Sequence, residues 1–373
     1  MAQKKFHNRI LMQTAFFVAA SITLPFSPSA WAQGNGSPAK TRPVARQATA
    51  PFLYAQSDAA MAFATDLAQR RDLDPAWVRQ QIGQAQRLPM VIRLMQPAPS
   101  GTPKNWAAYR ARFIEPIRLR AGQQFWEENR ETLARAEAEY GVPASLIVGV
   151  IGVETLYGRH KGTHKVIDAL TTLAFDFPAS HPRAAVRSEF FRSELEQYLS
   201  LTERTGTDPQ SLLGSYAGAM GWPQFLPSSW VKYAIDFDAD GKVDIYNNTA
   251  DVIGSVANYF KAFGWQSGLP THYPVRFDPN QSKDDLDALL APDILPSFSV
   301  ESFNAKGVVI DSPAAAQHTG KLALVELENA GAPSTFVAGT ENFYVVTRYN
   351  WSSYYALAVI ELGREVEALV SGR

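Results

Sequence analysis

Helical spacing of apolar residues dominates the chain from residue 57 to about residue 264. It predicts helices at residues 57–71, 75–85, 106–120, 123–140, 143–157, 188–205, 228–235 and 249–263. After residue 269, short β-like runs separated by Gly, Pro and Asn predict strands at residues 321–328, 335–337 and 343–347. A final helix carries one apolar stripe, formed by Tyr355, Val359, Leu362 and Val366. The pattern predicts an α+β fold that is mainly α-helical.

The first 32 residues have the pattern of a secretory signal peptide. Basic residues precede an apolar stretch at residues 10–24, and Ala-Trp-Ala at residues 30–32 matches a signal peptidase site. We expect the mature chain to begin at Gln33 with a flexible leader over residues 33–52, which is rich in Gly, Ser, Pro, Ala and Gln. A lipid anchor would need a cysteine after the signal, and the chain has none. These features predict a soluble periplasmic protein with no membrane anchor and no disulfide.

The charge balance narrows the class of partner. The chain has 35 Lys and Arg residues against 36 Asp and Glu residues, a formal net charge of −1. Long-range attraction to nucleic acid or to an anionic membrane is therefore not expected. Aromatic residues make up 12% of the chain, and some of them can act as flat platforms for sugars, although most are expected in the core. A neutral or mixed polymer fits this composition.

One carboxylate lies at the end of an otherwise apolar helix. Glu154 follows Val150 by four residues and Leu146 by eight, so it shares their helix face. Burial there raises the pKa of a carboxyl group and keeps it protonated near neutral pH, as a proton donor requires. The competing interpretation is a partly exposed glutamate at a helix end before Gly158.

Residues 213–229 contain three glycines and several small residues, which allow close approach of the backbone. Ser215 and Gln224 are the residues of this segment that could hydrogen-bond a ligand. The alternative is a tight crossing of two helices, with Ser228 as a helix cap.

Residues 236–244 match the first nine positions of a calcium loop, with acids at positions one, three, five and nine and the turn glycine at position six. Asn247 replaces the glutamate that normally closes the loop, and Asp251 is the nearest substitute. The expected ligands are Asp236, Asp238, Asp240, Lys242 and Asp251. A solvated acidic turn is the alternative.

Late in the chain, residues 348–355 place polar and aromatic side chains between the last predicted strand and the last helix. Spacing alone favours a role for Asn350 and Ser352 as helix caps.

Together these segments resemble the lytic murein transglycosylase B family. The matching motifs stand in family order and cover nearly all of the chain from about Phe52: residues 140–143, 151–158, 168–175, 214–221, 224–229, 254–260 and 342–350. The resemblance implies a lysozyme-like core over residues 141–268, a helical N-terminal domain over 53–140 and a small β subdomain over 269–341. Residues 342–373 would complete the core with a strand and a helix.

The resemblance also implies a function, which is cleavage of the MurNAc–GlcNAc β-1,4 bond of peptidoglycan with Glu154 as the single acid and base. The C6 hydroxyl of MurNAc would attack its own C1 and give a 1,6-anhydro sugar without water. The implied cofactor is structural Ca²⁺, with Na⁺ as the alternative ion, and the implied partners are glycan strands and complexes of cell-wall synthesis. The implied substrate-binding residues are Tyr109, Arg187, Ser215, Gln224, Tyr349, Asn350 and Tyr355.

Two other functions fit the same residues. A muramidase would add water at the cleaved bond, so its product would be heavier by one water. An idle glycan-binding or scaffold protein would release nothing, although retention of Glu154 together with Ser215 and Gln224 argues against it. The sequence does not distinguish exolytic from endolytic cleavage, and it gives no oligomeric state.

Overall fold

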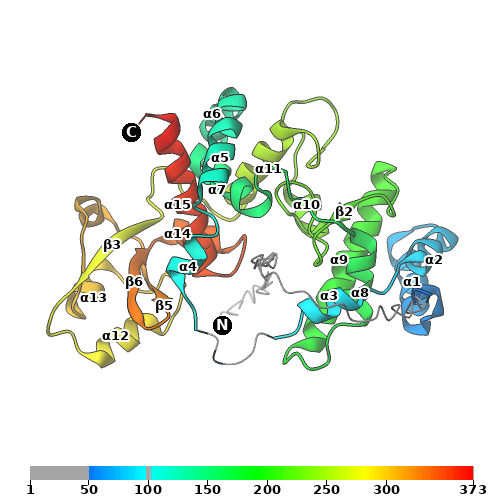
Figure 1. The fold of residues 1–373 in the computed structure, drawn as a ribbon, viewed down its shortest axis with the longest axis horizontal. Coiled ribbons are helices and arrows are strands. Elements are labelled where there is room, and N and C mark those ends of the chain that lie inside the picture. The colour runs from blue at the N-terminus through cyan, green and yellow to red at the C-terminus, as the bar shows by residue number, and fades with distance from the viewer. Residues whose placement is uncertain (1–49, 98–100, 102, 373) are drawn as a thin grey trace, which may run out of the picture.

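The computed structural model describes residues 50–97, 101 and 103–372, and it is mainly helical (Figure 1). The predicted signal peptide and nearly all of the predicted leader lie outside the described residues. The N-terminal elements are η1 (Tyr54–Gln56), α1 (Asp58–Arg71), α2 (Pro75–Gln84), α3 (Pro89–Leu94), α4 (Trp106–Arg110), α5 (Pro116–Glu128) and α6 (Arg130–Tyr140). The central elements are α7 (Ala144–Thr155), β1 (His164–Lys165), α8 (Val166–Phe175), α9 (Ala184–Thr205), β2 (Leu213–Gly214), α10 (Pro227–Tyr233) and α11 (Thr249–Ala262).

The β subdomain follows these helices and has a small core of its own. Its elements are β3 (His272–Phe277), α12 (Lys283–Leu290), α13 (Val300–Ala305), β4 (Val308–Ile310), η2 (Pro313–Gln317), β5 (Ala323–Asn329) and β6 (Ala332–Gly339). The strands form an antiparallel sheet in the order β4-β3-β6-β5. Tyr273, Leu289 and Phe303 are among the residues buried between this sheet and its helices. The chain then ends with α14 (Glu341–Thr347) and α15 (Ser353–Val370).

Several predicted elements are confirmed with small shifts at their ends. The segment predicted as one helix at residues 106–120 forms two, α4 and the start of α5. The second helix begins at Pro116, because proline fits the first position of a helix. The helix predicted over 123–140 divides at Asn129, which ends α5 and begins α6. Pattern reading missed α3, α8, α12 and α13 as helices.

The strand predicted at residues 343–347 is wrong, because this run forms α14. Thr340 caps the helix, since its side chain accepts the N–H of Asn342 at 3.1 Å. Phe343 and Val346, three residues apart, are both buried, so the apolar run serves a helix face. The strand and the helix predicted for residues 342–373 are therefore two helices. The predicted stripe on the last helix is confirmed, since Tyr355 and Val366 are both buried.

Two groups of N-terminal helices have different neighbours. Helices α1 to α3 lie on the side of α8 and α9 (Figure 1), where Arg70 and Arg71 both pair with Glu196 of α9 at 2.7 and 2.5 Å. Helices α4 and α5 pack on α15, and α6 packs on α7 and α11. From this second group, Arg118 of α5 donates to the carbonyl of Gly152, two residues before Glu154, at 3.0 Å.

Among the described residues no single helix has the length and apolarity needed to cross a membrane. Helices α6 and α7 have the required length and apolarity only when they are counted as one segment, and they meet at a bend of 116°.

Candidate active site

Close packing of α7 on α15 positions the candidate acid. Gly149 lies against the carbonyl of Val359, and Gly363 lies against the carbonyl of Ser145, so that a Cβ on either glycine would meet the oxygen at 2.2 or 2.0 Å. Because residue numbers rise along α7 as they fall along α15, the two helices are antiparallel (Figure 1). The last turn of α7 therefore lies beside the first turn of α15.

Glu154 and Tyr355 meet at this point. The Tyr355 hydroxyl donates a hydrogen bond of 2.5 Å to Oε1 of Glu154. Burial raises the pKa of Glu154 to about 7, and the hydrogen bond from Tyr355 opposes this rise by favouring the carboxylate. The residue nevertheless keeps partial access to solvent. At neutral pH this carboxyl group can therefore both give and take a proton.

Further tyrosines surround the same carboxyl group. Burial, followed by the nearby charge of Glu154, raises the pKa of Tyr109 to about 12. The same two causes hold the pKa of Tyr349 and of Tyr355 well above the usual value. The rings of Tyr349 and Tyr355 are stacked, with centroids 6.3 Å apart. These tyrosines stay neutral and can donate hydrogen bonds next to the acid.

Tyr259 also lies among the tyrosines near Glu154, although no role was predicted for it from the sequence. Its pKa is raised, first by burial, and Glu154 contributes to the rise. Its ring lies 4.7 Å from that of Tyr349, and its hydroxyl donates to the carbonyl of Arg348 at 2.7 Å. The available signal was its place in the motif at residues 254–260.

Ser215 and Gln224 lie in a non-helical turn region. The Ser215 Oγ accepts the N–H groups of Ala217 at 3.2 Å and Ala219 at 3.1 Å. The Gln224 side chain donates to the carbonyls of Lys161 at 3.3 Å and Gly221 at 2.9 Å. The alternative of a helix crossing is wrong, because short β bridges join this segment and α10 begins only at Pro227. Ser228 does not cap its own helix but bonds Glu194 of α9.

Two hydrogen bonds attach this turn region, residues 213–226, to Tyr349 and to the last turn of α7. Tyr349 donates to the carbonyl of Pro223 at 2.5 Å, and the Thr155 hydroxyl donates to the carbonyl of Trp222 at 3.0 Å. Gln224 is thereby held near the end of α7 through its two preceding neighbours.

Two more predicted residues lie close to these groups. Asn350 follows Tyr349 directly and is 5% exposed. Arg187 lies on α9 near Tyr216, the neighbour of Ser215; burial is the main cause that lowers its pKa, and Tyr216 opposes the change. The structure therefore places Tyr109, Tyr349 and Tyr355 directly around Glu154, whereas Ser215, Gln224, Asn350 and Arg187 are reached through neighbours.

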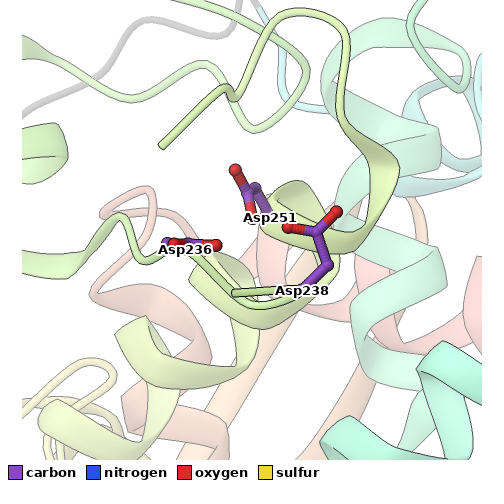
Figure 2. Close-up of side chains that lie close together, drawn as sticks. All are labelled: Asp236, Asp238 and Asp251. Carbon is purple, nitrogen blue, oxygen red and sulfur yellow. The ribbon is translucent and has the colours of Figure 1, made fainter. Parts of the chain in front are cut away.

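The acidic loop between α10 and α11 and the first turn of α11 together hold three of the predicted ligands. Carboxylate oxygens of Asp236, Asp238 and Asp251 lie within 4.8 Å of one another (Figure 2). Asp251 is fully buried and accepts the N–H groups of Phe237 and Asp244, both at 2.7 Å. Burial raises the pKa of Asp251, and the two nearby aspartates add to that rise. Three hard oxygen donors with mutual repulsion form a set that suits a Ca²⁺ ion.

Asp240 lies outside this group of three. Its Oδ1 accepts the N–H of Lys242 at 2.8 Å, while its own N–H points to Asp236 at 3.1 Å. In the described structure Asp240 therefore shapes the loop, and the predicted choice of Asp251 over Asn247 as closing acid agrees with the grouping.

A mainly helical, lysozyme-like fold with a glutamate of raised pKa in the last turn of α7 is typical of glycan-cleaving enzymes. Within this class, the family model "Transglycosylase SLT domain" matches residues 55–364. The chain belongs to this family of lytic transglycosylases.

Known relatives support the assignment over nearly the whole chain. The membrane-bound lytic murein transglycosylase B of Escherichia coli K12 is 36% identical over 329 residues, which is 84% of each chain. The soluble lytic transglycosylase SltB1 of Pseudomonas aeruginosa is 37% identical, with a TM-score of 0.74 over 84% of this chain and 100% of that one. The Escherichia coli lytic transglycosylase Slt35 in complex with calcium is 35% identical, with a TM-score of 0.73 over 85% of this chain and 95% of that one.

Proposed function

We propose that this protein cleaves the MurNAc–GlcNAc β-1,4 bond of peptidoglycan by lytic transglycosylation, with Glu154 as the single general acid and base. The observation that carries this proposal is the pKa of Glu154. Burial raises this pKa to about 7, and the hydrogen bond from Tyr355 limits the rise. A group that titrates near the working pH can hold a proton and also recover it within one catalytic cycle.

The first step is protonation of the glycosidic oxygen. Protonated Glu154 donates its proton as the bond to C1 of MurNAc breaks, and the sugar develops positive charge. Among the described groups whose pKa is shifted, those coupled to Glu154 are neutral tyrosines. Glycosidases that use water or a covalent intermediate place a second carboxylate beside the acid, whereas neutral tyrosines there favour attack by a group of the substrate itself.

In the second step Glu154, now a carboxylate, accepts the proton of the MurNAc C6 hydroxyl. The C6 oxygen bonds to C1, which closes the 1,6-anhydro ring and consumes no water. The N-acetyl group of the sugar is the candidate that stabilises charge at C1, and Ser215 or Asn350 would orient it. Tyr109, Arg187, Gln224, Tyr349 and Tyr355 complete the proposed contacts with the glycan.

We further propose a structural Ca²⁺ ion in the acidic loop. Asp236, Asp238 and Asp251 would hold it, with Na⁺ as the alternative ion. Support comes from the grouped carboxylates and from the calcium complex of Slt35. The ion would lie apart from the proton cycle, because Asp236 and Asp238 belong to the loop before α11 and Asp251 to the first turn of α11, whereas Glu154 lies in the last turn of α7.

We also propose that the mature protein works in the periplasm on glycan strands, in contact with complexes of cell-wall synthesis. This rests on the signal pattern of the sequence and on the family. The fate of residues 1–32 can be read by N-terminal sequencing of the exported protein, which should begin at Gln33.

Mass spectrometry of the muropeptides released from purified sacculi tests the function. Anhydro-muropeptides are expected. Products heavier by one water would instead identify a hydrolytic muramidase, and absence of any release, with binding retained, would identify an idle glycan-binding protein.

A further inference from the structure

A cavity of about 870 Å³ is lined by none of the residues placed around Glu154. It is formed by the C-terminal end of α9, by α10 and by residues 241–247 of the acidic loop. Arg204, which lines it, is 17 residues beyond Arg187 on the same helix, so the two lie about 25 Å apart along the helix axis. We call this cavity the distal site, because none of the predicted glycan contacts lines it.

Positive charge prevails in the distal site. Lys161, Arg204 and Lys242 line it against a single acid, Asp244. In the described part of the chain none of these three cations is within ion-pair distance of a carboxylate. Because the whole chain carries a net charge of only −1, this local excess is not a consequence of overall composition. The site therefore favours a ligand with negative groups.

Apolar surface lies next to these charges. Leu213, Val231 and Val243 keep 46%, 37% and 36% of their surface exposed, and all three line the distal site. The rings of Trp230 and Tyr246 lie 6.0 Å apart at its wall. Both rings are partly buried, and the edges of aromatic rings beside aliphatic groups suit the apolar faces of sugar rings. The cavity volume is also in the range of sites that hold small organic ligands.

The distal site is connected to the turn region by hydrogen bonds. The carbonyl of Lys161 accepts the side chain of Gln224 at 3.3 Å. The carbonyl of Tyr246 accepts the Trp222 indole N–H at 2.9 Å and the Lys161 ammonium at 3.0 Å. A ligand in the distal site would thus contact residues that also fix the neighbours of Glu154.

We propose that the distal site binds a second segment of the glycan strand, an amino-sugar chain recognised by its sugar faces and by the carboxylates of its lactyl and peptide groups. The inference rests on the proposed function, because it takes the polymeric substrate as the ligand. A polymer held at a second point stays at high local concentration near Glu154, which strengthens binding of long strands without changing the chemical step.

The test uses full-length protein with Glu154→Gln, so that the probe is not cleaved. Calorimetry with a soluble GlcNAc–MurNAc tetrasaccharide that carries stem peptides should show two binding events. The double variant Arg204→Glu/Val231→Asp, placed on exposed side chains, should leave one event. The double variant Arg120→Glu/Val309→Asp makes the same changes at exposed positions elsewhere and should keep both.

Kinetics with Glu154 intact provide the second measurement. The Arg204→Glu/Val231→Asp variant should raise KM for intact sacculi about fivefold, the size expected for loss of one or two charged contacts, and should leave kcat and KM for the tetrasaccharide unchanged. Chitotetraose, which lacks carboxylates, should bind at a single site.

Three results would overturn the proposal. Two binding events retained in the Arg204→Glu/Val231→Asp variant would show that the distal site is not used. Equal losses on sacculi and tetrasaccharide would indicate a structural defect that reaches Glu154. Tighter binding of a poly-glutamate peptide than of the glycan at this site would assign it to an acidic protein. Failure of the proposed function looks different, because the wild-type enzyme would then release no anhydro-muropeptides while glycan binding persisted.

Discussion

Tyr355 and Glu154, which are 201 positions apart in the sequence, are joined by a hydrogen bond of 2.5 Å. The contact exists because α15 crosses α7 at two glycines, where backbone approaches backbone. Its effect on the acid is opposite to that of burial: burial favours the protonated form, and the tyrosine favours the carboxylate. A proton cycle at neutral pH requires both forms.

Replacing Glu154 by glutamine should abolish release of anhydro-muropeptides and leave binding to sacculi largely intact. The amide has nearly the same shape but cannot cycle a proton, and loss of general acid and base help lowers rates by about 100- to 10,000-fold. Muropeptide release measured by chromatography and mass spectrometry checks this. Activity within a few-fold of wild type would refute the role given to Glu154.

The Tyr355→Phe variant should move the alkaline limb of the pH–rate profile. Because Glu154 must be protonated to act, activity should fall as pH rises through about 7. Loss of the hydrogen bond removes a contact that lowers the pKa of Glu154, so the limb should shift to higher pH. The profile of kcat/KM on a soluble glycan measures it. A shift to lower pH, or none at all, would contradict the assigned hydrogen bond.

Glu154 should also make stability depend on pH. Its folded pKa of about 7 lies above the ordinary value of 4.5, so its contribution is fully present below pH 4.5 and is lost as pH rises through 7. As pH rises from 5 to 8, the free energy of unfolding of Glu154→Gln should therefore increase relative to that of wild type by on the order of 1–3 kcal/mol. Denaturant unfolding at both pH values measures the difference, with Glu127→Gln as the control on an exposed helix face.

Ser215→Ala and Asn350→Ala should each lower turnover more than they weaken glycan binding. A group that orients the N-acetyl arm acts mainly on the charged transition state, so kcat should fall while the dissociation constant changes little. Ser215→Ala also removes the acceptor of two backbone N–H groups, so its Tm must be compared with that of Asn350→Ala. Defects confined to binding would make both residues ordinary glycan contacts.

Chelation should lower the Tm and leave activity at moderate temperature unchanged. A bound ion stabilises only the folded state, by about 2.7 kcal/mol at 100 times its dissociation constant. Asp238→Ala should make the Tm insensitive to added calcium, because it removes the oxygen donors of one of the three grouped acids. Asp293→Ala, at an exposed acid elsewhere, should keep the calcium effect. A Tm that ignores both calcium and chelator would show that the loop is only a solvated turn.

The sequence by itself predicted the elements whose pattern is local. Helical spacing gave most helices before residue 264, and it also gave the buried stripe that includes Tyr355 and Val366. Motif order gave the family and singled out Glu154. The calcium-loop spacing predicted Asp236 and Asp238 as ligands, and the structure places their carboxylates close together because residues so near in sequence follow the geometry of the turn.

Contacts between distant segments were decided only by the tertiary structure. Residues 343–347 read as a strand because a short apolar run fits either element, and burial of Phe343 and Val346 against the core selects the helix. The grouping of Asp251 with Asp236 and Asp238 brings α11 against the loop, and the role of Asp240 as a further ligand stays a prediction. Tyr259 carried no signal of function beyond its place in the motif at residues 254–260, because a tyrosine on an apolar helix otherwise reads as core. Its place beside Glu154 and Tyr349 depends on packing, a property of the whole fold rather than of any one segment.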